Sequence, residues 1–206
     1  MIHLEDDFFE DPYSIRSIAL KSKYYSAEDY TWPGCRCWSI PEIVTNNILF
    51  KVRSIVGDPN LNFDYSRTQI PGYPNSSFQY ITKEFGDGVY HSDEGLHYIC
   101  IIYLSLESSL DSGTEICDYD HGSDTFPRST TTKLKQSFLR DPYNLIKRYR
   151  YARIRRKLNS YYNPLMKVPN KFNRGVIFPA TYFHRAQNYF GTSIESARLT
   201  SVSFLG

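Results

Sequence analysis

The sequence lacks any hydrophobic run long enough to cross a membrane. Its longest apolar stretch, Ile99 to Leu104, is far shorter than the roughly 18 residues that a membrane helix needs. Residues 1–7 are acidic rather than basic, so they do not resemble a secretory or organellar signal. Hydrophobic residues make up 41% and charged residues 22% of the 206 positions, which excludes disorder as the main state. We expect one globular domain over residues 1–206, cytoplasmic and without a membrane partner.

Cysteine is scarce, and its spacing does not suit a metal. Cys35 and Cys37 form a Cys-x-Cys pair, whereas Cys100 and Cys117 stand alone. This pattern matches no common zinc spacing. We therefore expect reduced, structural thiols in a reducing compartment.

The net charge of +2 conceals a strong segregation of charge. Every Asp, Glu, Lys or Arg between Glu84 and Asp124 is acidic, whereas the charged residues of 133–157 are all basic except Asp141. Within the basic segment, residues 147–157 mix Arg with Tyr, as a surface that contacts phosphates and stacks on bases would. We favour the simpler interpretation, a charged helix face in which Tyr151, Ile154 and Leu158 form the buried stripe.

The first part of the chain has helical patterns. Asp11 and Pro12 are typical of an N-cap followed by proline at the first helical position. A second helix is expected after the capping-box pattern Ser39–Glu42, and Gly57 is expected to end it. We expect residues 1–58 to form a helical buttress.

Short strands and turns dominate the rest of the chain. Tyr98–Leu104 is continuously apolar, which predicts a strand buried on both faces. An insert over 123–170, with a basic helix in its middle, is expected to interrupt the strands. The fold class predicted is mainly β with buttressing helices (α+β), as a sandwich or open barrel. The other expected strands are 78–83, 115–116, 175–178 and 199–205.

Three residues are candidates for a metal site. His91 and Asp93 are two positions apart, so on an extended segment both side chains point to the same face. His184 follows another predicted strand. Two histidines and one carboxylate form the facial triad of non-haem Fe(II) oxygenases, which leaves coordination positions open for a co-substrate and dioxygen.

Arg198 and Thr200 are candidates for the co-substrate site. If this segment is a strand, both side chains lie on one face. A guanidinium group and a hydroxyl group suit the distal carboxylate of 2-oxoglutarate. The ordered set of His-x-Asp, apolar strand, Gly-Thr turn, His and Arg-x-Thr favours this interpretation over an ordinary surface arginine.

These motifs resemble the Fe(II)/2-oxoglutarate-dependent dioxygenases, in particular the prolyl-4-hydroxylase-like branch. The resemblance spans about residues 78–205. Two positions depart from the family pattern: Ser105 replaces the usual Asn, and Ser112 replaces the first Gly of the usual Gly-Gly-Thr turn. The motifs that carry the resemblance are His91-Ser92-Asp93, Ile101-Ile102-Tyr103-Leu104-Ser105, Ser112-Gly113-Thr114-Glu115, Asn173–Phe178, His184 and Arg198-Leu199-Thr200.

The resemblance implies a double-stranded β-helix (jelly roll) with a core over 78–120 and 171–206. It implies Fe(II) bound by His91, Asp93 and His184, with 2-oxoglutarate and dioxygen as co-substrates. Arg198 would hold 2-oxoglutarate, assisted by Thr200 and by Tyr103, which matches a tyrosine of the family. The reaction implied is hydroxylation, because halogenating members lack the carboxylate that Asp93 supplies here.

Two other functions remain open from the sequence alone. A non-catalytic β-barrel module would bind nucleic acid or an acidic partner through residues 147–157. A zinc hydrolase would use the same triad and would not need Arg198. For the favoured oxygenase, the expected substrate is an amino acid, a peptide or a protein residue, and Glu94 and Asp118 suggest a cationic one.

Overall fold

The computed structural model describes residues 1–26, 32–38, 40–64, 75–93, 95–117 and 128–206. Within these ranges, no helix combines the length and the apolar character that a membrane crossing requires. The helices are α1 (Pro12–Lys21), α2 (Glu42–Val56), α3 (Arg128–Leu139) and α4 (Leu145–Asn159), with short 3-10 helices η1 (Lys83–Phe85) and η2 (Leu110–Ser112). The strands are β1 (His3–Glu5), β2 (Tyr24–Ser26), β3 (Cys35–Cys37), β4 (Ser76–Ile81), β5 (Tyr98–Tyr103), β6 (Thr114–Cys117), β7 (Pro164–Val168), β8 (Gly175–Pro179), β9 (Phe183–Ala186) and β10 (Arg198–Leu205).

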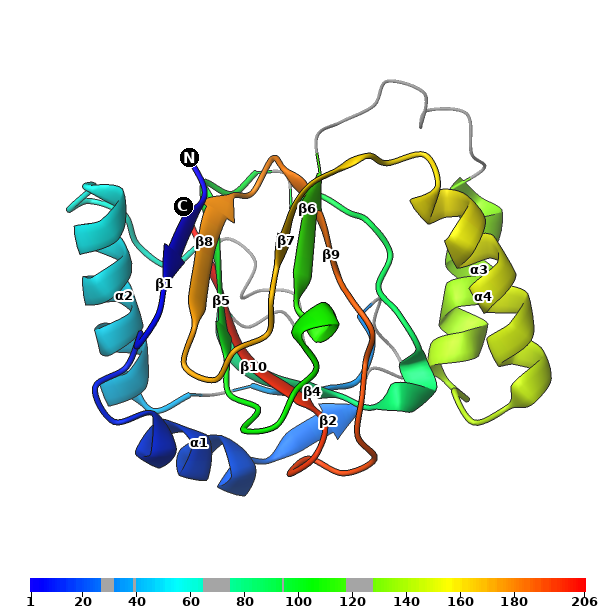
Figure 1. The fold of residues 1–206 in the computed structure, drawn as a ribbon, viewed down its shortest axis with the longest axis horizontal. Coiled ribbons are helices and arrows are strands. Elements are labelled where there is room, and N and C mark those ends of the chain that lie inside the picture. The colour runs from blue at the N-terminus through cyan, green and yellow to red at the C-terminus, as the bar shows by residue number, and fades with distance from the viewer. Residues whose placement is uncertain (27–31, 39, 65–74, 94, 118–127) are drawn as a thin grey trace.

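Two antiparallel sheets form the body of the molecule (Figure 1). The larger sheet has the strand order β1-β8-β5-β10-β4-β3-β2, and the smaller sheet has the order β7-β6-β9. From β5 onward the chain passes back and forth between the sheets, since β5, β8 and β10 lie in the larger sheet whereas β6, β7 and β9 lie in the smaller one. The architecture is mainly β with helices, as predicted.

The central strand β5 is buried on both faces, as its continuous apolar sequence predicts. Ile99, Ile101 and Tyr103 face the core between the two sheets. Cys100 and Ile102 face the opposite core, where the apolar sides of α1 and α2 cover the larger sheet. This helical layer leaves the inner face of the sheet available for a site.

The two N-terminal helices follow from their local sequence. Asp11 caps α1 by accepting a hydrogen bond from the Ser14 amide, and Pro12 is its first residue. α2 begins at Glu42 and ends at Val56, and its C-cap is Gly57, as predicted, whose φ of 78° is readily adopted by glycine. Pro41 makes no side-chain capping bond, and Ser39, on which the capping box was predicted, lies outside the described residues.

The described part of the range expected to interrupt the strands, residues 128–170, contains two packed helices and one strand. α3 and α4 pack against each other, with the Phe138 and Tyr151 rings stacked at 4.8 Å. The predicted buried stripe is only partly correct, since Tyr151 is buried whereas Ile154 and Leu158 are half-buried. β7 lies in the same range and pairs with β6, so this segment also contributes to the smaller sheet.

Candidate metal centre

His91 and His184 lie side by side at the β9 edge of the smaller sheet. His184 is on β9, and the backbone of His91 pairs with it: His91 N donates to His184 O at 3.1 Å, and His184 N donates to His91 O at 2.9 Å. The segment that ends at His91 therefore extends the smaller sheet beyond β9. The two imidazole ring centres are 4.3 Å apart.

Asp93 completes a cluster of three potential metal ligands. Its amide donates to the Ala180 carbonyl at 3.0 Å, and its Oδ2 lies 3.6 Å from His184 Nε2. One ligand atom from each of His91, Asp93 and His184 lies within 4.8 Å of the others. The structure thus brings together the three residues that the sequence predicted as ligands.

The hydrogen bonds of the two imidazoles suit metal binding. His91 Nδ1 lies 2.9 Å from the Val89 carbonyl oxygen, and His184 Nδ1 lies 3.2 Å from that of Tyr182. A carbonyl oxygen only accepts, so each Nδ1 carries the proton and each Nε2 offers its lone pair. Burial, reinforced by nearby His91, lowers the pKa of His184 to about 3, so its imidazole is neutral at neutral pH. Two imidazoles and a carboxylate are a donor set that fits Fe(II).

Gly88 permits the close approach that places His91. Its amide donates to the Ala186 carbonyl at 2.9 Å. A Cβ atom at this position would lie 2.5 Å from that oxygen and 2.9 Å from the Ala186 nitrogen, so a side chain would force the strands apart. The glycine therefore allows the 88–91 segment to pair with β9.

A buried ion-pair network supports the same edge. Arg185, next to His184, donates from Nε to Glu115 Oε2 at 2.6 Å and also pairs with Asp87. The Glu115 side chain on β6 is 1% exposed. Its Oε1 also forms an ion pair with Lys167, whose Nζ lies 3.4 Å away. The network links β6, β7 and β9 to the segment that carries His91.

Replacement of Glu115 by glutamine is expected to lower the free energy of unfolding by about 3 kcal/mol, because it removes one partner of a buried ion pair. Urea denaturation would measure the change. Glu107→Gln, at an exposed position, is the matched control and should stay within about 0.5 kcal/mol of the parent. Equal stability of the two variants would contradict a structural role for the network.

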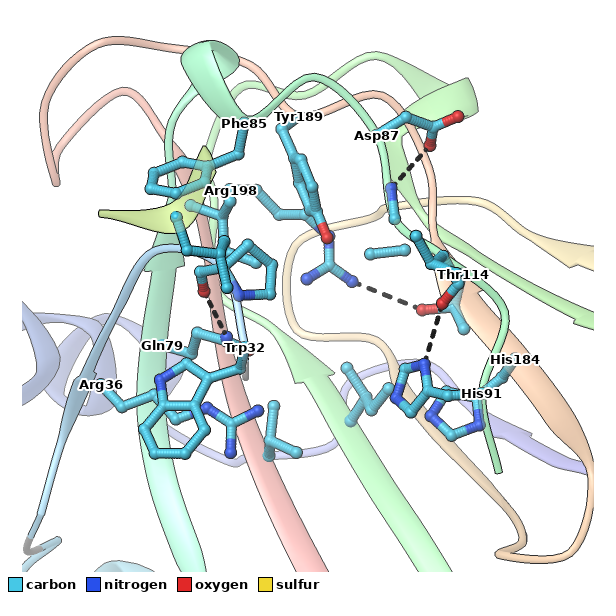
Figure 2. Close-up of a pocket in the computed structure, with 18 of the residues that line it drawn as sticks. Trp32, Arg36, Gln79, Phe85, Asp87, His91, Thr114, His184, Tyr189 and Arg198 are labelled. Carbon is cyan, nitrogen blue, oxygen red and sulfur yellow. Dashed lines mark hydrogen bonds between the residues drawn. The ribbon is translucent and has the colours of Figure 1, made fainter. Parts of the chain in front are cut away.

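A cavity of about 330 Å³ opens beside the triad, and Arg198 lies in it (Figure 2). Arg198 begins β10 and is 2% exposed. Its Nε donates to the Ser112 carbonyl at 3.3 Å, and one terminal nitrogen donates to Thr114 Oγ1 at 3.4 Å. His91, Asp93, His184 and Arg198 all line this one cavity.

Tyr103 and Thr200 lie beside this cavity rather than among the residues that line it. The Tyr103 hydroxyl donates to Thr114 Oγ1 at 2.7 Å, and the Arg198 guanidinium lies 5.5 Å from the Tyr103 ring centre. Thr200 donates to the Gln79 carbonyl at 3.5 Å. Direct contact of these two hydroxyls with a ligand stays a prediction. Thr114, which links Tyr103 to Arg198, was not predicted as a site residue although it lies in the quoted Gly-Thr motif.

The basic helix α4 supports one wall of the site. Arg155 donates to the carbonyl oxygens of Phe85 and Asp87, both at 2.9 Å. Asn159 donates to the Gly88 carbonyl at 2.9 Å and receives the Tyr90 amide at 3.3 Å. One end of the basic segment is therefore used to hold the chain that leads to His91.

Segments far from the motifs also contribute to the cavity. These segments belong to the predicted buttress and the predicted insert, and no local motif in the sequence indicates that they reach the site. The residues are Trp32 and Arg36 from the N-terminal part, and Lys135, Phe138 and Tyr151 from α3 and α4.

Comparisons with known proteins support the fold. No protein-family model and no curated protein matches the chain. Among solved structures, HygX from Streptomyces hygroscopicus, with nickel and 2-oxoglutarate bound, is similar over 100% of this chain and 82% of its own, at 13% identity and a TM-score of 0.55. A prolyl hydroxylase from Trichoplax adhaerens, in complex with a hypoxia-inducible-factor peptide, is similar over 98% of this chain and 82% of its own, at 9% identity and a TM-score of 0.50. The chain has the jelly-roll-like, prolyl-hydroxylase-like fold of the 2-oxoglutarate oxygenases, as predicted.

Proposed function

We propose that this protein is an Fe(II)- and 2-oxoglutarate-dependent dioxygenase that hydroxylates a small substrate or a residue of a larger one. The observation that carries the proposal is the convergence of His91, Asp93 and His184, within 4.8 Å of one another, on a cavity that also holds the buried Arg198. Iron would supply the oxidative chemistry, coupling decarboxylation of 2-oxoglutarate to succinate with insertion of oxygen into a C–H bond.

The triad would hold the metal on one side and leave its other side to the cavity. His91 and His184 present their Nε2 atoms, because backbone carbonyls fix the opposite ring nitrogens. Asp93 supplies the negative charge. Because its pKa is lowered, the His184 imidazole is already neutral at neutral pH. It would therefore bind a divalent ion without first losing a proton.

Arg198 would anchor the distal carboxylate of 2-oxoglutarate. Its guanidinium is held between the Ser112 carbonyl and Thr114, above the Tyr103 ring, so it is orientated before the ligand arrives. A preorganised guanidinium in a buried site binds a carboxylate more strongly than one in water, because solvent does not compete. Tyr103 and Thr200 would act by holding this arrangement in place.

The two neighbours are consistent with this proposal. HygX holds nickel and 2-oxoglutarate, and nickel would take the place of Fe(II) in such a site. The prolyl hydroxylase holds a peptide, which suggests an amino acid, a peptide or a protein residue as substrate classes to test. Dioxygen is the remaining co-substrate.

Anaerobic addition of Fe(II) and 2-oxoglutarate to the purified protein is expected to produce the weak visible charge-transfer band of the metal chelate. Succinate in place of 2-oxoglutarate is the control and should produce no band, because it lacks the keto oxygen. A folded protein that shows no band with 2-oxoglutarate would contradict the proposed function. Hydrolysis supported by zinc without 2-oxoglutarate would favour the hydrolase, and salt-dependent nucleic-acid binding without succinate production would favour the non-catalytic module.

A further inference from the structure

The cavity holds a tyrosine hydroxyl group close to the guanidinium of Arg198. Tyr189 lines the cavity and is 8% exposed. Figure 2 shows its ring entering the cavity with the hydroxyl group directed toward the Arg198 guanidinium. Among the described residues, this hydroxyl group has no hydrogen-bond partner. Most buried polar groups are hydrogen-bonded, so an unpartnered hydroxyl inside a cavity points to a ligand.

The chain that follows β9 turns the Tyr189 ring into the cavity. The Tyr189 amide donates to the Gly86 carbonyl at 2.9 Å, which holds this segment beside the loop that leads to His91. Asn188, just before it, has a φ of 33°, a positive value that asparagine tolerates better than most residues. The exposed Asn188 side chain donates to Asp111 Oδ2 at 3.0 Å. The turn therefore directs Asn188 to the surface and Tyr189 inward.

The Tyr189 hydroxyl group is a hydrogen-bond donor at neutral pH. Burial raises the pKa of Tyr189 to about 12, although the nearby positive charge of Arg198 opposes the rise. A phenol that keeps its proton can donate to an anion, and a carboxylate accepts hydrogen bonds at both of its oxygens. Tyr189 and Arg198 can thus donate to the same carboxylate.

Arg198 has donors left for a ligand. A guanidinium group carries five N–H donors. The Ser112 carbonyl receives one of them, and Thr114 Oγ1 receives another. These two bonds fix the plane of the guanidinium, so the remaining donors are preorganised.

The carboxylates that line the cavity do not neutralise Arg198. Asp87 belongs to the buried ion-pair network, and Asp93 lies at the metal centre. Within the part of the chain that the structure describes, Arg198 forms no ion pair with a carboxylate. A carboxylate from a ligand would supply the missing partner. Glu94 and Asp118, from which a cationic primary substrate was expected, lie outside the described residues.

The two hydroxyl groups that the sequence predicted for the co-substrate are engaged elsewhere. Tyr103 and Thr200 are both fully buried and do not line the cavity. The Tyr103 hydroxyl donates to Thr114, and that of Thr200 donates to the Gln79 carbonyl. A ligand in the cavity would therefore contact the hydroxyl of Tyr189 rather than either of these.

We propose that Tyr189 is a second anchor of the co-substrate, whose hydroxyl donates to the distal carboxylate of 2-oxoglutarate while Arg198 donates to the same group. The identity of this ligand rests on the proposed function. Tyr103 is then a positioning residue that acts on Arg198 through Thr114 without touching the ligand. Donors from two directions fix the orientation of the carboxylate, so the keto acid at the other end faces the triad.

The first experiment needs no metal. Glutarate has both carboxylates of 2-oxoglutarate but lacks the keto oxygen, and it is titrated into the metal-free full chain with thermal unfolding as the readout. Glutarate is expected to raise the Tm of the wild-type protein. Tyr189→Phe should weaken glutarate binding about tenfold or more, because a hydrogen bond to a charged group is lost. Tyr149→Phe, at an exposed position on α4, is the matched control and should bind glutarate like the wild type.

The Tm values without ligand separate a binding role from a structural one. The Tyr189 hydroxyl bonds no described residue, so Tyr189→Phe should change the Tm by no more than about 1 °C. Tyr103→Phe removes the buried bond to Thr114 and should lower the Tm by about 2–4 °C. If Tyr189→Phe lowered the Tm as much as Tyr103→Phe, its hydroxyl would serve the fold rather than a ligand.

Two further results would overturn the inference: no response of the wild-type Tm to glutarate, or equal glutarate affinity in the Tyr189→Phe and Tyr149→Phe proteins. Neither result depends on the charge-transfer band. If the band is absent but the glutarate response still depends on Tyr189, the proposed function fails and the carboxylate site stands. If the band is present and Tyr189→Phe matches its control, only the inference fails.

The second experiment uses the anaerobic band of the Fe(II)-loaded protein. Pyruvate carries the same keto acid as 2-oxoglutarate but has no distal carboxylate. Tyr189→Phe is expected to raise the Kd of 2-oxoglutarate about tenfold and to leave that of pyruvate unchanged. An equal loss of affinity for both keto acids would contradict a contact between Tyr189 and the distal carboxylate.

Discussion

Replacement of Asp93 by alanine is expected to weaken Fe(II) binding by more than about 100-fold and to abolish the charge-transfer band. Loss of a group that merely orientates a metal ligand costs about 10–100-fold in affinity, and Asp93 is proposed as a ligand itself. It supplies the only carboxylate of the triad, so the two remaining imidazoles would carry no charge to offset that of the metal. Titration with Mn(II), followed by electron paramagnetic resonance, measures the affinity directly.

The position of Asp93 makes this variant a clean test. Its side chain is 18% exposed, whereas that of His184 is 6% exposed, so alanine at 93 removes fewer buried contacts than alanine at 184. Asp111→Ala, which removes an exposed carboxylate outside the cavity lining, is the matched control. If the Asp93→Ala protein binds Mn(II) as tightly as the control, the triad does not hold the metal.

Replacement of Arg198 by methionine is expected to weaken 2-oxoglutarate binding by about 100-fold while leaving Mn(II) affinity nearly unchanged. Removing one partner of a buried, hydrogen-bonded charge pair costs about 2–5 kcal/mol, and each 1.4 kcal/mol is about tenfold in affinity. Methionine keeps an unbranched apolar side chain at this buried position but removes the guanidinium that lies 5.5 Å from the Tyr103 ring centre. The concentration dependence of the anaerobic band measures the binding of 2-oxoglutarate.

Two controls sharpen the Arg198 test. Arg148→Met removes an exposed arginine of α4 and should leave the band unchanged. Arg198→Lys keeps the charge but loses the planar fork, so an intermediate affinity is expected. Unchanged 2-oxoglutarate affinity in the Arg198→Met protein would exclude Arg198 as the anchor. If the Arg198→Met protein kept its full enzymatic activity, the zinc hydrolase would be favoured.

The proposed ligand set was predictable because its signal is local or chemically specific. His91 and Asp93 are two positions apart, and the extended backbone between them turns both side chains the same way. His184 required only a predicted strand before it and a third donor of suitable chemistry. The convergence of the three residues confirms that geometry.

The contribution of Arg36 and Lys135 to the cavity was not predictable in the same way. Arg36 lies on a three-residue strand that has no clear alternation, and Lys135 lies in a segment that reads only as basic. Each enters the cavity through long-range contacts, the pairing of β3 with β4 and the packing of α3 against α4. The periodicity of hydrophobic residues along the sequence does not predict such long-range contacts.

Local sequence was sufficient to predict the central buried strand, the capped first helix and the residues of the triad, because these depend on residues close together in the chain or on donor chemistry. Which other side chains share the cavity with the triad depends on long-range packing. Antiparallel pairing and helix packing bring distant segments within a few ångströms, and that proximity, rather than any local pattern, places Thr114 beside Arg198 and Lys135 near Arg36.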